Sequence, residues 1–428
     1  MTDYCAIDFG TSNSAVALPD GAGVRLVALE AGQPTMPTAV FYVADPDEAA
    51  ERGDRLVGRA ALAAYVEGVD GRLMRSMKSV LGSSLVDQTT DVGGGRAVRY
   101  LDVIGAYLRH LRDQAARAQD RPVTRVVLGR PVFFVDDDPV RDAQAQAALE
   151  VAARSVGFTE VQFQYEPIAA ALDFERQAVR ELRVLVADIG GGTSDFSLVR
   201  VGPERARRAD RRDDILANHG VHVAGTDFDR QLSLAAILPT CGYRSLGPAA
   251  PGQPGREVPN RVYFDLATWH LINTVYGPAR VAELARMRDF YAEPRLHERL
   301  MRVVRERLGH WLAARAEAAK IAVAQGGATT IPLDEIEPGL EVPLSEARAA
   351  QALDSDLQRI VDAAVQTVRL AGLGPEAVDV LYFTGGSTGL LPLVDRLAAQ
   401  FPAAERVRGD ALASVGQGLG LHARRLFG

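Results

Sequence analysis

Residues 184–201, VLVADIGGGTSDFSLVRV, decide the fold that we predict for this chain. The apolar start is typical of a strand buried on both faces, and a second apolar strand follows a turn of three glycines. The glycines 190–192 can adopt positive φ and let a ligand approach the backbone. Their N–H groups and the Thr193 hydroxyl can form an anion cradle, and Asp188 beside it suits a hydrated Mg²⁺ ion. The stretch predicts a hairpin that binds phosphate and Mg²⁺, with an ordinary glycine-rich hairpin turn as the alternative.

A similar stretch, residues 4–18, YCAIDFGTSNSAVAL, opens the chain. It places Asp8 near the end of an apolar strand, and a second apolar strand follows a polar turn. The turn consists of Gly10, Thr11, Ser12 and Asn13. Because the same order of acid, glycine and hydroxyl occurs twice, we expect two similar halves that each contribute one phosphate loop to a shared cleft.

Residues 7–14, IDFGTSNS, and 188–195, DIGGGTSD, resemble the two phosphate loops of Hsp70 proteins, within the actin/hexokinase/Hsp70 ATPase superfamily. Further Hsp70-like motifs follow in the family's order, at residues 166–172, 220–229, 316–324 and 380–396. The resemblance implies an α/β actin-like ATPase fold, with two duplicated ribonuclease H-like lobes around a nucleotide cleft. It predicts lobe I at residues 1–177 plus 405–428 and lobe II at 178–404, with a helical outer subdomain at about 230–345.

The composition narrows the class of protein. With 428 residues the chain is long enough for two or more domains with their own cores. A net charge of −7 argues against general nucleic-acid binding. Cys5 and Cys241 are too few for a disulfide framework, which favours a reducing compartment. Neither a signal peptide nor an apolar run of about 20 residues is visible, so we expect a cytoplasmic protein without a membrane partner.

The chain contains only two lysines, Lys78 and Lys320, among its 48 basic residues. Lysine and arginine are not interchangeable where a compact cation must approach phosphate, because the arginine fork is broader. The two lysines are therefore candidates for positions that arginine cannot fill. The alternative is that both are ordinary surface residues.

The resemblance to Hsp70 implies roles for the residues around the phosphates. Lys78 would reach the γ-phosphate and the attacking water, and Glu166, Asp188 or Asp195 would orient that water. Glu166 can alternatively serve only the N-terminus of its helix. Asp8 and Asp188 would hold Mg²⁺ through water. The predicted phosphate-binding residues are Gly10, Thr11, Ser12, Asn13, Gly190, Gly191, Gly192, Thr193 and Gly225.

The same resemblance implies an adenosine site, and here the sequence departs from the family. Glu317 and Lys320 match the family's ribose-binding pair, although an i, i+3 spacing also permits a plain surface salt bridge. Ile321 and Gly389 replace the two arginines that flank adenine, which predicts weaker binding or looser base selectivity. The remaining predicted nucleotide-binding residues are Gly385, Gly386, Ser387 and Asp410.

The implied function is slow Mg²⁺-dependent hydrolysis of ATP to ADP that acts as a conformational switch, in a chaperone or assembly factor. The chain resembles the YegD-like branch of Hsp70-like proteins, which lacks the peptide-binding domain. We expect a monomer with an unidentified protein client or co-chaperone. The alternatives are a polymerising ATPase of the actin or MreB type and a small-molecule kinase of the same superfamily.

Two further features carry simpler expectations. The mixed-charge run at residues 204–214, ERARRADRRDD, predicts a solvated loop or hairpin tip. Trp269 and Trp311, within a long helical stretch, are most simply core residues. Both expectations concern structure alone and imply no ligand.

Overall fold

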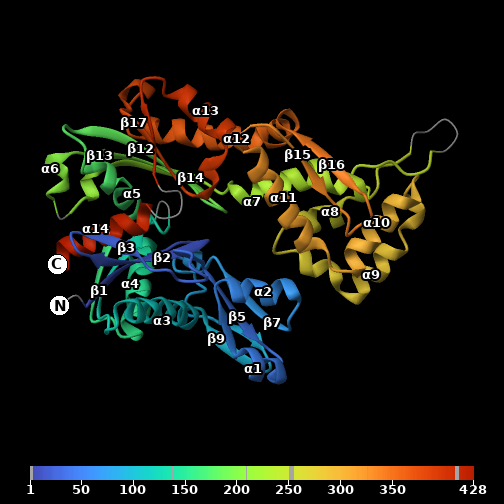
Figure 1. Ribbon diagram of the computed structural model, residues 1–428, viewed down its shortest axis with the longest axis horizontal. Coiled ribbons are helices and arrows are strands. Elements are labelled where there is room, and N and C mark those ends of the chain that lie inside the picture. Colours follow the sequence, from blue (N-terminus) through green and yellow to red (C-terminus); the bar gives the residue numbers. More distant parts are fainter. Residues whose placement is uncertain (1–2, 136–137, 209, 250–254, 325, 410–413) are drawn as a thin grey trace.

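The computed structural model describes residues 3–135, 138–208, 210–249, 255–324, 326–409 and 414–428. Two mixed sheets form the centre of the molecule, one in each half of the chain (Figure 1). The first has the order β11-β10-β1-β2-β3, with β4 paired to β2. Its strands are β1 (Tyr4–Phe9), β2 (Asn13–Asp20), β3 (Gly23–Leu26), β4 (Thr35–Pro37), β10 (Arg125–Arg130) and β11 (Glu160–Tyr165).

The second sheet repeats the arrangement of the first, with the order β14-β13-β12-β17-β18. In each sheet a central strand pairs antiparallel with the strand that follows it and parallel with a strand from later in the chain. The duplication predicted from the two glycine stretches is therefore present in the topology. The strands are β12 (Leu182–Ile189), β13 (Ser194–Val201), β14 (Ile215–Val221), β17 (Val380–Thr384) and β18 (Glu405–Arg408).

Two helices lie side by side between the sheets, α5 (Glu166–Glu175) and α14 (Ser414–Phe427) (Figure 1). Helix α14 contacts β1 and β2, whereas α5 contacts β12 and β13. Ala169 lies against Gly418, where any side chain larger than hydrogen would collide with the α5 backbone. The close approach of the two helices holds the sheets together near the chain's C-terminal end.

The outer face of each sheet is covered by long amphipathic helices, whose apolar sides form separate cores. Helices α3 (Tyr100–Gln119) and α4 (Pro139–Ser155) cover the first sheet, and α12 (Glu346–Leu370) and α13 (Leu391–Gln400) belong to the second half. No helix that the structure describes combines the length and apolar character needed to cross a bilayer.

Each half carries an outer part. In the first half it contains β5 (Ala39–Val43), β6 (Arg55–Val57), β7 (Gly71–Arg75), β8 (Thr89–Gly93), β9 (Arg96–Arg99), α1 (Pro46–Arg52) and α2 (Arg59–Glu67). In the second half it is mainly helical (Figure 1). It contains α7 (Gly225–Leu232), α8 (Arg261–Ala267), α9 (Pro278–Ala285), α10 (Pro294–Arg305), α11 (Gly309–Val323), β15 (Ala328–Pro332) and β16 (Glu341–Ser345).

The two outer parts meet through an aromatic cluster. The ring of Tyr65 from α2 stacks on Trp269 with centroids 4.9 Å apart, and the Arg75 guanidinium lies 4.3 Å from the Trp269 centroid. His310 from α11 meets both rings edge-on. The prediction that both tryptophans are core residues is wrong, because each is only half-buried. Trp269 packs across the two outer parts, and Trp311 lies at the border of a core.

The prediction of a solvated loop or hairpin tip at residues 204–214 is confirmed for most of the run, which connects the antiparallel strands β13 and β14 and is mostly exposed. Two of its charged residues are exceptions. The run forms α6 (Pro203–Ala206) and a short helical turn, and Arg211 and Asp214 are buried. Arg211 donates two hydrogen bonds to Glu175 of α5, at 2.9 and 2.8 Å, and pairs with Asp214. Burial is tolerated because these charges neutralise one another and their hydrogen bonds are satisfied.

Candidate functional site

The second glycine loop, residues 190–193 between β12 and β13, is held by hydrogen bonds to its carbonyl oxygens. The Gly190 carbonyl accepts from the Gly225 N–H at 3.2 Å and from the Ser387 hydroxyl at 2.7 Å. The Gly191 carbonyl accepts from the N–H and the hydroxyl of Thr226, both at 2.8 Å. These donors come from the start of α7 and from the turn at Gly386–Gly389, so the loop is fixed from one side.

The opposite side of this loop presents unused donors. The Gly190 N–H closes the turn onto the Thr193 carbonyl at 3.0 Å. Among the described residues, the N–H groups of Gly191, Gly192 and Thr193 have no acceptor. Successive free N–H groups of this kind form a concave site for an anion.

The three glycines of the second loop do not use the freedom to adopt positive φ that their residue type gives them, because none of the residues 190–192 has a positive φ. At Gly191 the requirement is instead space, because a Cβ atom there would lie 3.1 Å from the Ser12 hydroxyl. Ser12 belongs to the first loop, so the two predicted phosphate loops lie face to face. A positive φ occurs at Gly385, at +88°, where the chain turns against Asp188 and Ile189.

The first loop is built in a similar way. Gly10 has no room for a side chain, because a Cβ atom would collide with the Asn13 carbonyl. The Ser12 carbonyl accepts from the Thr38 N–H at 2.9 Å, which ties the loop to the start of β5. Thr11 and Ser12 are half-buried and Asn13 is exposed. The structure therefore brings the two loops together through Ser12 and Gly191.

Lys78 lies beside these loops and is only 8% exposed. It belongs to a short helical turn, Met77–Val80, and its ammonium group forms an ion pair with Glu166 at the start of α5. Gly129 of β10 leaves room for the partner, because a Cβ atom there would lie 3.2 Å from the Glu166 Cγ atom. Lys78 is thus buried at the site and is not a surface lysine.

Four carboxyl groups share this one lysine. Burial raises the pKa of Asp8 to about 8, with a further increase from Glu166. Burial raises the pKa of Asp188 to about 7, with further increases from Asp195 and Glu166. Lys78 lowers both values but does not outweigh these effects. Burial also raises the pKa of Asp195, although this residue retains a solvent-exposed surface. The excess of carboxylates over cations makes the site receptive to an added cation.

The donor set fits Mg²⁺ bound largely through water. Within the described ranges, no group of three or more His, Cys, Asp or Glu side chains has the arrangement of a direct metal site. Mg²⁺ retains several waters in proteins and is typically held by one or two carboxylates together with phosphate oxygens. The half-buried carboxylates of Asp8 and Asp188 match that pattern, and mutual repulsion between carboxylates would be relieved by the cation.

The residues predicted to hold adenosine are divided between two environments. Lys320 is mostly buried and forms an ion pair with Asp229 at 2.9 Å, not with Glu317. Glu317 is exposed, and Ile321 on the same helix is 63% exposed. A side chain at Gly389 would meet open space. Ser387 binds the glycine loop, and Asp410 lies outside the described residues.

Sequence reasoning missed two residues of the site. Thr226 was not singled out, although its N–H and hydroxyl both bind the Gly191 carbonyl. The carboxylate of Asp229 pairs with Lys320, and the neighbouring Asp227 accepts from the Ala224 N–H. The sequence signal for Thr226 was its position directly after Gly225, which was predicted to bind phosphate. Its hydrogen-bond partner, Gly191, lies 35 residues earlier in the chain.

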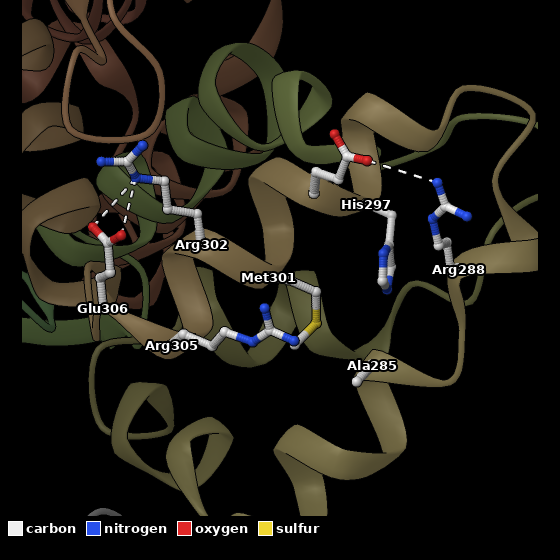
Figure 2. Close-up of a pocket in the computed structure, with 8 residues that line it drawn as sticks. Ala285, Arg288, His297, Met301, Arg302, Arg305 and Glu306 are labelled. Atoms are coloured by element: carbon white, nitrogen blue, oxygen red, sulfur yellow. Dashed lines mark hydrogen bonds and ion pairs between the residues drawn. The ribbon is translucent and has the colours of Figure 1, made fainter.

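A separate cavity of about 380 Å³ lies on the outer helices, away from both glycine loops (Figure 2). Arg302 and Glu306, two of its lining residues, form an ion pair at 3.1 Å. His297 hydrogen-bonds the Leu284 carbonyl at 2.9 Å. Three of its polar lining residues are therefore engaged by contacts within the protein.

Comparison with known proteins supports the resemblance seen in the sequence. Residues 90–234 match the family model described as "Hsp70 protein". The chain is 29% identical to chaperone protein DnaK of Mycoplasmoides gallisepticum over 53% of this chain and 34% of that protein. It is 29% identical to DnaK of Cyanophora paradoxa over 54% of this chain and 37% of that protein. It is 30% identical to the chloroplastic heat shock 70 kDa protein 6 of Arabidopsis thaliana over 53% and 31%.

These matches span about a third of the length of the relatives. The region matched by the family model contains Glu166, the second glycine loop and Gly225. Together with the two sheets of equal topology, the match gives the chain the actin-like ATPase fold, as predicted.

Proposed function

We propose that this Hsp70-like chain binds MgATP between its two glycine loops and hydrolyses it slowly to ADP and phosphate. The observation that carries the proposal is the face-to-face approach of the loops at Ser12 and Gly191, beside the buried ion pair of Lys78 and Glu166. A site for a phosphate chain needs N–H donors, a cation and carboxylates for Mg²⁺, and all three meet here.

Each group has a proposed role. The N–H groups of the second loop bind phosphate oxygens, and Lys78 stabilises the negative charge that develops during transfer of the γ-phosphoryl group. Glu166, Asp188 or Asp195 orients the attacking water and accepts its proton. Asp8 and Asp188 would hold Mg²⁺ through water, and the chemistry that the ion would supply there is positive charge beside the phosphates. The hydroxyls of Thr11 and Thr193 lie in the same two loops and assist in binding the phosphates.

The wider role follows from the resemblance and from the names of the relatives. DnaK is described as a chaperone, which supports a chaperone or assembly function with an unidentified protein partner. The assignment to a YegD-like branch rests on the sequence resemblance alone. Closure of the two halves on the nucleotide would act as the switch, which favours slow turnover. A monomer in the cytoplasm remains our prediction, as does looser base selectivity, which the exposed Ile321 supports.

Titration calorimetry of the purified chain with MgADP and then MgATP tests the proposal. We expect binding of both, followed by single-turnover release of phosphate from MgATP. The surface variant Arg52→Met should bind equally well, because Arg52 only forms an exposed ion pair with Glu67. The absence of heat with either nucleotide would refute the proposal. Acceptor-dependent release of ADP would indicate a kinase, and MgATP-dependent sedimentation would indicate a polymerising protein.

A further inference from the structure

Lys320 makes two contacts that point away from a role as a nucleoside ligand. Its ammonium group lies 2.9 Å from a carboxylate oxygen of Asp229 and donates a hydrogen bond to the Gly225 carbonyl at 3.2 Å. The side chains of Lys320 and Asp229 are 15% and 19% exposed. Both partners belong to α7, whereas Lys320 belongs to α11. The ion pair with Asp229 and the hydrogen bond to Gly225 therefore join α11 to α7.

The first turn of α7 is also the part of the helix that holds the second glycine loop. The Gly225 N–H binds the Gly190 carbonyl, and Thr226 binds the Gly191 carbonyl through its N–H and its hydroxyl. Lys320 binds the same first turn of α7, because its ammonium group donates to the Gly225 carbonyl. A continuous path of hydrogen bonds thus leads from Lys320 through Gly225 to the loop that presents free N–H groups.

The space around this path is tight. A Cβ atom at Gly225 would lie 2.5 Å from the Ser387 hydroxyl oxygen and 3.5 Å from the Lys320 ammonium nitrogen. A compact ammonium group fits between the Asp229 carboxylate and the Gly225 carbonyl. The guanidinium of arginine is broader and planar, so it would not reproduce both contacts in the same geometry. This difference in shape gives a physical reason for lysine at this position in a chain that has only two lysines.

We propose that Lys320 is a positioning residue for the second glycine loop, acting through Asp229 and the first turn of α7. The inference rests on the proposed binding of MgATP and changes the role that the sequence assigned to Lys320, from ribose binding to control of the phosphate-binding loop. Glu317, the other member of the predicted ribose-binding pair, lies one turn earlier on α11 and is exposed. Lys320 pairs with Asp229 and not with Glu317.

The test compares Lys320→Met with the wild-type chain, using three ligands that each contain a different part of the nucleotide. MgADP carries the base, ribose and phosphates, inorganic tripolyphosphate with Mg²⁺ carries only phosphates, and adenosine carries no phosphate. Affinities are measured by displacement of a fluorescent ADP analogue. We expect Lys320→Met to weaken MgADP and tripolyphosphate by the same factor, about tenfold, because a charged hydrogen-bonding partner is lost, and to leave adenosine unchanged.

The other outcomes overturn the inference. Weaker binding of MgADP and adenosine with unchanged tripolyphosphate would make Lys320 a nucleoside ligand. An equal loss for all three ligands would indicate a general structural defect. Asp229→Asn should reproduce the effect of Lys320→Met, and it carries the test if the methionine variant does not fold. Glu317→Gln is the matched comparison and should leave tripolyphosphate binding unchanged. If the wild-type chain bound no MgADP, the proposed function itself would fail.

Discussion

Replacing Lys78 by arginine tests whether the site requires a compact cation. The exchange preserves the positive charge and changes only the shape and size of the group. Lys78 is 8% exposed and already pairs with Glu166, whose Cγ atom would lie 3.2 Å from a Cβ atom at Gly129. A guanidinium at position 78 must displace Glu166 or shift the helical turn Met77–Val80 outward. Either movement displaces the cation from its place beside the glycine loops.

The expected magnitudes follow from this geometry. Forcing a larger group into a packed site costs about 1–3 kcal/mol of unfolding free energy. Misplacing a group that stabilises transition-state charge lowers the rate by about 100-fold, which corresponds to about 2.7 kcal/mol of activation free energy. Lys78→Met removes the charge and leaves the room, so it should reduce hydrolysis to a similar extent with less crowding.

Single-turnover hydrolysis at saturating MgATP measures the rate, and urea denaturation measures the stability. The control is Arg52→Lys, an exchange in the opposite direction within an exposed ion pair, which should change neither quantity. Hydrolysis by Lys78→Arg within threefold of the wild-type rate would refute the reasoning. It would mean that arginine serves equally well and that the survival of lysine at this position has no functional cause.

Three further predictions concern groups outside the phosphate site. Burial lowers the pKa of His310 to about 4, so this residue stabilises the fold above its unfolded pKa of about 6.5 and loses that contribution as the pH falls toward 4. Between pH 7 and pH 5 the unfolding free energy of the wild type, measured with urea, should therefore fall by about 2 kcal/mol relative to that of His310→Gln, and a constant difference would contradict this reasoning. Trp269→Leu removes the stack on Tyr65 and the contact with Arg75, which together contribute about 1–3 kcal/mol of interaction free energy between the two outer parts. The variant should release fluorescent ADP faster in stopped-flow experiments, and an unchanged rate would be the contrary result. Arg211→Met leaves the buried carboxylate of Glu175 without its cationic partner and should lower the unfolding free energy by about 3–5 kcal/mol. A loss below about 1 kcal/mol would contradict the view that the ion pair is desolvated.

The parts of the site that could be predicted from sequence are those encoded by local patterns. An apolar run, an acid and a glycine turn recur at residues 4–18 and 184–201, and this repetition predicted two similar sheets and two loops. The rarity of lysine marked Lys78 and Lys320 as candidates for positions that arginine cannot fill. Lys78 is buried and Lys320 mostly buried, and the requirement for lysine stays a prediction. In each case the signal lay within one short segment or in the composition of the whole chain.

The features that escaped prediction depend on partners far away in the sequence. Arg211 lies in a run of charges that is polar by every local measure, but Glu175, 36 residues earlier, makes its burial possible. The glycines 190–192 can adopt positive φ but none does, whereas a Cβ atom at Gly191 would lie 3.1 Å from the hydroxyl of Ser12, a residue of the other half of the chain. A local sequence pattern indicates which backbone conformations a residue can adopt. The contacts that a residue makes with distant parts of the chain are visible only in the structure.

The duplication of the fold does not extend to the chemistry of the two hairpins. Asp188 lies opposite Asp195 in its ladder, whereas Asp8, at the corresponding place in the first sheet, lies opposite Ala15. The first half contributes the cation, Lys78, together with Glu166 at the start of the helix that leads into the second half. The second half contributes the additional acid and the loop whose carbonyl oxygens are held by α7. Since neither half contains both the cation and the fixed N–H groups, the hydrolysis that we propose would require the halves to be held together. We therefore expect any movement that separates the loops to stop that reaction as well as release the nucleotide.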